Sequence, residues 1–176
     1  PCHGVELRVV DEGGNDVATG AVGEVITRGD HVMGGYYLRD GVADDGTAAR
    51  AVVDGWLQTG DLGRVDGEGR LFLVDRKGDM IISGGYNIYP REVEDVIAEV
   101  PGIREVAVVG VSDPDWGQRV VAVWSAVPGA SVTDEMLAAH CRDRLASFKK
   151  PKALHRVESF PHSSTGKIAK RELRNR

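Results

Sequence analysis

Three short clusters contain the residues of this 176-residue sequence that could do chemistry. The first cluster, Gly55–Gly63, places the carboxylate of Asp61 in a glycine-flanked turn. A carboxylate held there could accept two hydrogen bonds from a vicinal diol such as that of ribose. The alternative interpretation is a turn aspartate that accepts hydrogen bonds only from its own backbone.

The other two clusters combine glycine with a short strand or with a lysine. Ser83–Asn87 follows an apolar run and exposes backbone where a substrate could pass, although a β-bulge or hinge would have the same composition. Lys167 follows the small-residue turn Ser163–Gly166 at the start of an expected helix. On general grounds an ordinary exposed lysine at a helix start is the favoured interpretation. A cation is electrostatically disfavoured at a helix N-terminus, however, which gives some support to a functional lysine.

Generic catalytic and metal-binding motifs do not fit. A P-loop ending at Gly166-Lys167 would need glycine where Pro161 stands and serine or threonine where Ile168 stands. The sequence contains no GxGxxG after a strand, no GxSxG and no HExxH. Five histidines are scattered and two cysteines form no zinc-type spacing, so we expect no metal site.

The elements that position these clusters change character near residue 78. Before it we expect a meander of short strands, and after it strands alternating with helices. The expected strands are Val5–Val9, Val22–Thr27, Val32–Tyr37, Trp56–Thr59, Gly63–Asp66, Arg70–Val74, Met80–Ile82, Val106–Val111, Val120–Val127 and His155–Ser159. The expected helices lie near Thr47–Val52, from Pro90 to a stop at Pro101-Gly102, after a cap at Thr133, and over Ile168–Arg174.

Composition narrows the class of protein further. The net charge of −5 and pI near 5.5 argue against broad binding to nucleic acid or anionic membranes. No apolar run approaches the roughly 20 residues of a membrane span, and no signal peptide opens the sequence. With few cysteines, a reducing, cytoplasmic setting is expected. Because the chain begins at Pro1, we expect a processed product or a fragment.

The order and spacing of the clusters resemble the C-terminal portion of the adenylate-forming acyl-CoA synthetases, a superfamily that includes luciferases and peptide-synthetase adenylation domains. The matching stretches are Gly23–Val25, Gly35–Tyr37, Gly55–Gly63, Asp75–Glu94, Phe148–Lys152 and Pro161–Ile168. The resemblance implies an α+β fold. Residues 1–77 would be the β-rich, partly barrel-like end of the large domain, and residues 78–176 the small mobile C-terminal domain.

The resemblance also implies roles for individual residues. Asp61 would hold the ribose hydroxyls of ATP or AMP, and Arg76 would contact the ribose-phosphate region. Gly78 occupies the hinge position, where many relatives carry aspartate or lysine, and glycine can absorb the backbone change of a domain rotation. Lys167 would be the catalytic lysine that steadies the substrate carboxylate and the α-phosphate.

A CoA site is implied by five further positions. Gly84 and Gly85 would line the pantetheine tunnel in the thioester-forming state. Phe148 would stack on the adenine, while Lys150 and Lys152 would bind phosphates. The alternative for these last three residues is a solvated basic loop.

The implied activity is ATP-dependent ligation of a carboxylic acid, expected to be a fatty acid, to CoA. ATP with Mg²⁺ and CoA would act in the full-length enzyme, none being held tightly by this chain. The missing N-terminal domain would be the intramolecular partner, so the isolated chain is expected to be inactive. Alternatives are a non-catalytic interaction module on the same fold, or a peptide-synthetase domain with a carrier-protein thiol as acceptor.

Overall fold

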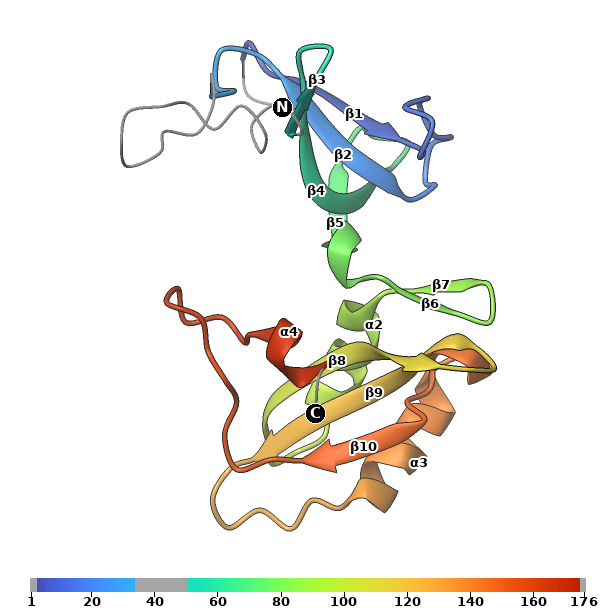
Figure 1. Cartoon of the computed structure of the whole chain (residues 1–176), viewed down its shortest axis with the longest axis vertical. Helices are drawn as coiled ribbons and strands as arrows, with labels where there is room; N and C mark the ends of the chain where they lie inside the picture. The colour runs from blue at the N-terminus through green and yellow to red at the C-terminus, as the bar shows by residue number, and fades with distance from the viewer. Residues whose placement is uncertain (1–2, 34–50, 175–176) are drawn as a thin grey trace. The chain divides into compact units, whose positions relative to one another are not determined.

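The computed structural model describes residues 3–33 and 51–174, and these form two compact units, Pro1–Gly78 and Asp79–Arg176. We describe each unit by itself. Figure 1 shows a curled sheet in the first unit, and a sheet with helices in the second. Among the described residues no helix is long and apolar enough to cross a membrane.

The first unit is a five-stranded antiparallel sheet. Its strands are β1 (Glu6–Val10), β2 (Gly23–Arg28), β3 (Val52–Val53), β4 (Trp56–Val65) and β5 (Leu71–Arg76). Their order is β1-β2-β4-β3, with β5 also paired to β4. The sheet curls along the long strand β4 (Figure 1), which agrees with the partial barrel expected from the sequence. Strands β1, β2 and β5 lie within two residues of their predicted positions.

The turn between β4 and β5 follows the sequence prediction closely. The Asp66 carboxylate accepts backbone hydrogen bonds from Glu68 and Arg70, both at 2.9 Å. These bonds, led by the one from Arg70, lower the pKa of the Asp66 carboxyl below its usual value. The backbone amide of Gly69 closes the turn on the Asp66 carbonyl at 3.0 Å.

Two predictions for this unit were wrong in detail. Residues 56–59 and 63–66 were expected as separate strands about a corner, but β4 is continuous. Between the pairs Glu24↔Leu62 and Ile26↔Gln58, the register advances by two residues on β2 but by four on β4. The extra residues of β4 form a bulge, so the strand bends at the expected corner without ending there. Val52, expected to end a short helix, pairs in β3.

Other parts of these predictions lie outside the described residues. Of the helix expected near Thr47–Val52, residues 47–50 lie outside the described ranges. So does most of the strand expected over Val32–Tyr37. At its described start, the Val32 amide donates to the Gly29 carbonyl at 3.0 Å and forms a turn.

The second unit has a five-stranded mixed sheet with helices on both faces. Its elements are β6 (Ile81–Ser83), β7 (Tyr86–Ile88), α2 (Pro90–Ala98), β8 (Ile103–Asp113), β9 (Gly117–Ala126), α3 (Asp134–Arg144), β10 (Ala153–Arg156) and α4 (Lys170–Leu173), with short 3-10 turns at Lys77–Asp79 (η1) and Ser147–Lys149 (η2). The order is β10-β9-β6-β7, with β8 also on β9, and only β10 runs parallel to its neighbour.

Alternating residues of β8 and β9 are buried on opposite faces of the sheet. Val108, Ala122 and Trp124 pack with α2 and α3, whereas Val109 and Val121 pack with α4 and the segment before it. The valine-rich runs predicted as buried strands are therefore covered on both sides.

The helix predictions were confirmed where the pattern is strong. Pro90 opens α2, and Val93 and Ile97 are buried on its apolar face. Thr133 caps α3 by accepting a hydrogen bond from the Met136 amide at 3.3 Å. Leu137, Cys141 and Leu145, predicted to share one face, are all buried.

The C-terminal elements were predicted less accurately. The strand expected over 155–159 lies at β10, two residues earlier. The last helix is limited to α4 because the Ala169 amide donates to the Pro161 carbonyl and Ile168 pairs with His162.

Candidate functional site

Strand pairing in the first unit joins the two predicted nucleotide residues. Asp61 on β4 lies opposite Arg76 on β5. The Arg76 Nε atom is 2.8 Å from Asp61 Oδ1, and the Arg76 Nη1 atom also donates to the Thr59 carbonyl at 3.3 Å. The Asp61 side chain is 32 % exposed and that of Arg76 is 60 % exposed, so both groups can reach a ligand. A carboxylate beside a guanidinium suits a diol next to a phosphate.

A second ion pair is hydrogen-bonded to the backbone beside Asp61. The nearly buried Glu24 accepts a hydrogen bond from the Gly60 amide at 3.3 Å and pairs with Lys77 Nζ at 2.6 Å. The Thr59 hydroxyl donates to the Val25 carbonyl at 2.6 Å and accepts from the Asp61 amide at 3.1 Å.

The supporting residues received no role from the sequence. Glu24 lies in one of the stretches that carry the resemblance, but its partners are 36 and 53 residues away. Only pairing of the strands brings Gly60 and Lys77 to it.

Gly78 lies in η1, at the boundary of the two units. Its φ is outside the left-handed region, and a Cβ added there would meet no described atom within 4 Å. The conformation therefore has room for a side chain at this position. The next residue, Asp79, pairs with Arg174 of the same unit at 2.7 Å.

Gly84 and Gly85 form the turn of a β6–β7 hairpin, where the sequence had left open a backbone exposed to a passing substrate, a β-bulge or a hinge. Their φ values of +56° and +81° fit a type I′ turn, which requires left-handed backbone at both central residues. The Trp116 ring covers Gly84 so closely that a Cβ there would lie 2.5 Å from it. Trp116 remains 53 % exposed, and Lys152 Nζ lies 5.9 Å from its ring centre.

Phe148 is stacked on Tyr86, with 4.6 Å between ring centroids and 23° between planes. Its neighbour Lys149 pairs with Glu92 at 2.6 Å. The predicted CoA residues Phe148 and Lys152 thus lie beside the aromatic side chains of the β6–β7 hairpin and the β8–β9 turn. Sequence reasoning gave no role to Trp116 or Tyr86. For Trp116, the available signal was a tryptophan next to Gly117.

Lys167 follows a tight turn that the sequence correctly predicted. The Gly166 amide donates to the Ser163 carbonyl at 2.9 Å, and the Ser163 amide donates to the Lys167 carbonyl at 2.8 Å. Its side chain is exposed, and within the described part of the chain it has no ion pair. Figure 1 shows the segment before α4 and the β6–β7 hairpin on opposite sides of this unit.

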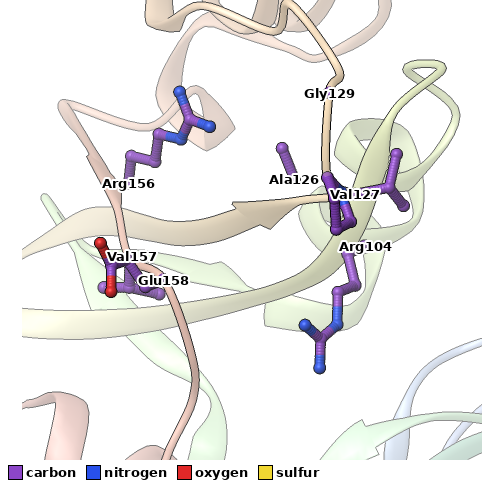
Figure 2. Close-up of a pocket in the computed structure, with 8 residues that line it drawn as sticks. Arg104, Ala126, Val127, Gly129, Arg156, Val157 and Glu158 are labelled. Atoms are coloured by element: carbon purple, nitrogen blue, oxygen red, sulfur yellow. The ribbon is translucent and has the colours of Figure 1, made fainter.

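A pocket of about 450 Å³ lies at the far ends of β8, β9 and β10. It is lined by Arg104, Ala126, Val127, Pro128, Gly129, Arg156, Val157 and Glu158. Figure 2 shows the guanidinium groups of Arg104 and Arg156 extending in different directions, so they do not form a two-armed anion clamp. The predicted site residues do not line it. No group of three or more acidic, histidine or cysteine side chains in the described ranges could hold a metal ion.

Comparison with known proteins identifies the class. Residues 92–167 match the AMP-binding enzyme C-terminal domain. Together with the fold, this places the chain in the adenylate-forming family, as the sequence predicted. More narrowly, the chain is homologous to the C-terminal portion of acid–CoA ligases. It spans about a third of the length of the curated relatives that it matches.

Two curated relatives illustrate the range of substrates. A long-chain-fatty-acid–CoA ligase of Escherichia coli O157:H7 is 41 % identical over 99 % of this chain and 30 % of its own length. An indoleacetate–CoA ligase of Aromatoleum aromaticum is 43 % identical over 96 % of this chain and 32 % of its own length. The acid therefore differs among relatives of similar identity.

Solved structures agree with this assignment. The amide bond synthetase McbA from Marinactinospora thermotolerans has a TM-score of 0.87 at 40 % identity, covering 98 % of this chain and 34 % of its own. O-succinylbenzoate coenzyme A synthetase (MenE) from Bacillus subtilis, in complex with ATP and magnesium ion, has a TM-score of 0.84 at 33 % identity. That match covers 100 % of this chain and 34 % of MenE.

Proposed function

We propose that this chain is the C-terminal part of an ATP-dependent ligase that joins a carboxylic acid to CoA through an acyl-adenylate. Residues 1–77 would complete the large domain, and residues 78–176 would form the mobile one. In the first step the acid's carboxylate attacks the α-phosphate of ATP and pyrophosphate leaves. In the second step the CoA thiol attacks the acyl carbon and AMP leaves.

The observation that carries this proposal is the solvent-accessible Asp61–Arg76 pair, next to a second ion pair between Lys77 and the nearly buried Glu24. Asp61 would accept hydrogen bonds from the ribose hydroxyls, and Arg76 would contact the adjoining phosphate region. Mg²⁺ would arrive bound to the phosphates of ATP.

Lys167 would contribute to the adenylation step. Its exposed ammonium group has no ion-pair partner among the described residues, so it is available to a substrate carboxylate and to charge developing at the α-phosphate. A positive charge fixed at this point stabilises the transition state more than the ground state.

The thioester-forming step would use the opposite side of the same unit. Rotation about Gly78 would withdraw Lys167 and present the Gly84–Gly85 hairpin to the pantetheine arm. Phe148 and Lys152 lie near this hairpin through the contacts of Tyr86 and Trp116, which supports a CoA site there, and Lys150 would add a further cation.

A fatty acid is our proposed substrate, on the strength of the fatty-acid–CoA ligases among the relatives. Assay of the full-length enzyme with long-chain fatty, arylacetic and succinylbenzoic acids tests this choice. Preference for either aromatic acid would contradict it. A cytoplasmic setting is also proposed, since the buried Cys141 is a free thiol.

The test of the mechanism is Lys167→Ala in the full-length enzyme. Pyrophosphate release should fall on the order of 10²-fold, because a preorganised charge is lost. Thioester formation from supplied acyl-adenylate should be retained. Arg171→Ala, which removes an exposed cation four residues away, is the matched control and should leave both steps unchanged. Equal loss of both steps in Lys167→Ala would contradict the assignment.

The isolated 176-residue chain provides a second test, since adenylation needs the absent part of the enzyme. We expect no pyrophosphate release from it with any acid. We also expect weak but specific binding of CoA in a calorimetric titration. Pyrophosphate release by the pure chain would overturn the first expectation, and absence of CoA binding would favour a non-catalytic module.

A further inference from the structure

We infer that Asp79 and Arg174 are positioning residues, which tie the hinge to the segment that carries Lys167. This inference rests on the proposed role of Lys167 in adenylation. Asp79 directly follows the hinge glycine, and Arg174 directly follows α4. Although 95 residues separate them in the sequence, the Arg174 Nη2 and Asp79 Oδ1 atoms are 2.7 Å apart.

The ion pair acts on Lys167 through a short, closed segment. Pro161–Ala169 folds back on itself, with backbone hydrogen bonds from Ala169 to Pro161 at 2.8 Å and from Ser163 to Lys167 at 2.8 Å. Lys167 therefore lies on a loop that leads directly into α4, and only two residues separate Lys167 from the start of that helix. Any shift of α4 moves that end of the loop.

Helix α4 needs such an attachment because it is too short to hold itself. It contains four residues, fewer than an isolated helix requires. Leu173 inserts into the core beside β8 and β9, with 3 % of its surface exposed. Lys170 pairs with Glu94 of α2 at 2.7 Å, and both side chains are largely buried, at 20 % and 14 % exposed.

The two ion pairs hold opposite ends of α4 on different supports. Lys170 at its start is fixed to α2, while Arg174 at its end is fixed to the residue after the hinge. The Asp79 and Arg174 side chains are 29 % and 35 % exposed, so water screens this pair only partly. A third contact, between His162 and Glu105 at 2.8 Å, holds the other end of the loop on β8.

Placing one attachment beside the hinge has a mechanical consequence. When the backbone turns at Gly78, Asp79 is the first residue that moves with the second unit. Because Arg174 is bound to it, α4 and the Lys167 loop turn with the hinge as one body. Loss of the pair should leave Lys167 attached but poorly aimed, and a poorly aimed charge stabilises a transition state less.

The first test is hydrogen exchange on the 176-residue chain. Arg174→Gln and Asp79→Asn should each raise the exchange rates of the Ser163 and Gly166 amides by about tenfold or more. Amides in the centre of β9 should be unaffected. Arg171→Gln, a neighbouring exposed cation with no ion pair among the described residues, is the control. Unchanged exchange at Ser163 in both variants would overturn the inference.

The second test separates the two steps in the full-length enzyme. Arg174→Gln should slow adenylation about tenfold while thioester formation from supplied acyl-adenylate falls much less. The charge-reversed double variant Asp79→Arg/Arg174→Asp should recover most of the adenylation rate. Equal slowing of both steps, or no recovery in the double variant, would show that the ion pair only stabilises the fold and does not position Lys167, and would overturn the inference. If Lys167→Ala itself leaves adenylation intact, the proposed function fails; if only Arg174→Gln does so, this inference fails alone.

Discussion

The turn at Gly84 and Gly85 allows two effects of a side chain to be separated by two substitutions. Both residues have left-handed backbone, with φ values of +56° and +81°. Alanine in that region costs roughly 1–2 kcal/mol, offset in part by about 0.4–1 kcal/mol from the smaller entropy of the unfolded chain. At Gly85 nothing lies within 4 Å of an added Cβ, so only this strain applies. Gly85→Ala should therefore lower the free energy of unfolding by about 1 kcal/mol.

Gly84→Ala should cost about twice as much. Its Cβ would lie 2.5 Å from Cε3 and 2.8 Å from Cζ3 of Trp116, so the ring must move. Overpacking typically costs about 1–3 kcal/mol, and the lower end applies because Trp116 is half exposed and can shift outward. The total for Gly84→Ala is then about 2 kcal/mol.

Urea unfolding of the chain, followed by tryptophan fluorescence and circular dichroism, measures both values. Acrylamide quenching of the folded variants reports whether Trp116 becomes more exposed, which we expect for Gly84→Ala only. Gly85→Asn is the matched control for strain, because asparagine tolerates left-handed backbone, and should cost less than Gly85→Ala. Equal losses in the two alanine variants, without a change in quenching, would refute the role given to Trp116.

Three further results are expected. Burial raises the pKa of the Cys141 thiol above its usual 9.0, so the folded chain keeps a proton that the unfolded chain loses. The contribution of this thiol to stability should be constant below about pH 9 and decline above it, and Cys141→Ala should weaken that decline in urea titrations. Asp134→Ala should cost about 1–3 kcal/mol in the same assay, because the buried Trp124 indole N–H loses its acceptor at 2.8 Å. Gly78→Asp should change stability by less than about 0.5 kcal/mol, measured by thermal melting, since a Cβ added at this position meets nothing within 4 Å.

Each of these has a clear contradicting outcome. A pH dependence above 9 that is identical in Cys141→Ala would show that other groups dominate it. An unchanged unfolding midpoint in Asp134→Ala would mean that the indole finds another partner. A large loss in Gly78→Asp would indicate that the hinge needs glycine in this conformation.

Patterns confined to a few neighbouring residues were readable from the sequence. The spacing of Val93 and Ile97, the cap at Thr133 and the turn at Asp66 each depend on one helix face or one set of backbone bonds. The ordered clusters, including Asp61 and Lys167, were sufficient to identify the family.

Contacts between distant segments were not readable. The sequence divides β4 at its Thr-Gly-Asp corner because glycine and aspartate disfavour strands, yet pairing with both β2 and β5 keeps the strand continuous. It likewise predicted no hairpin at Gly84–Gly85, since β7 is only three residues long and is recognisable only by its pairing with β6.

The sequence alone therefore determined the family, the two-part organisation as a hypothesis, and the local turns and helices. The tertiary structure decided which charges meet. Glu24 reaches Lys77 across 53 residues and Asp79 reaches Arg174 across 95, and no periodicity encodes such pairs. Their positions follow from strand register and core packing, which are properties of the whole unit, whereas a turn or a cap follows from hydrogen bonds within a few residues.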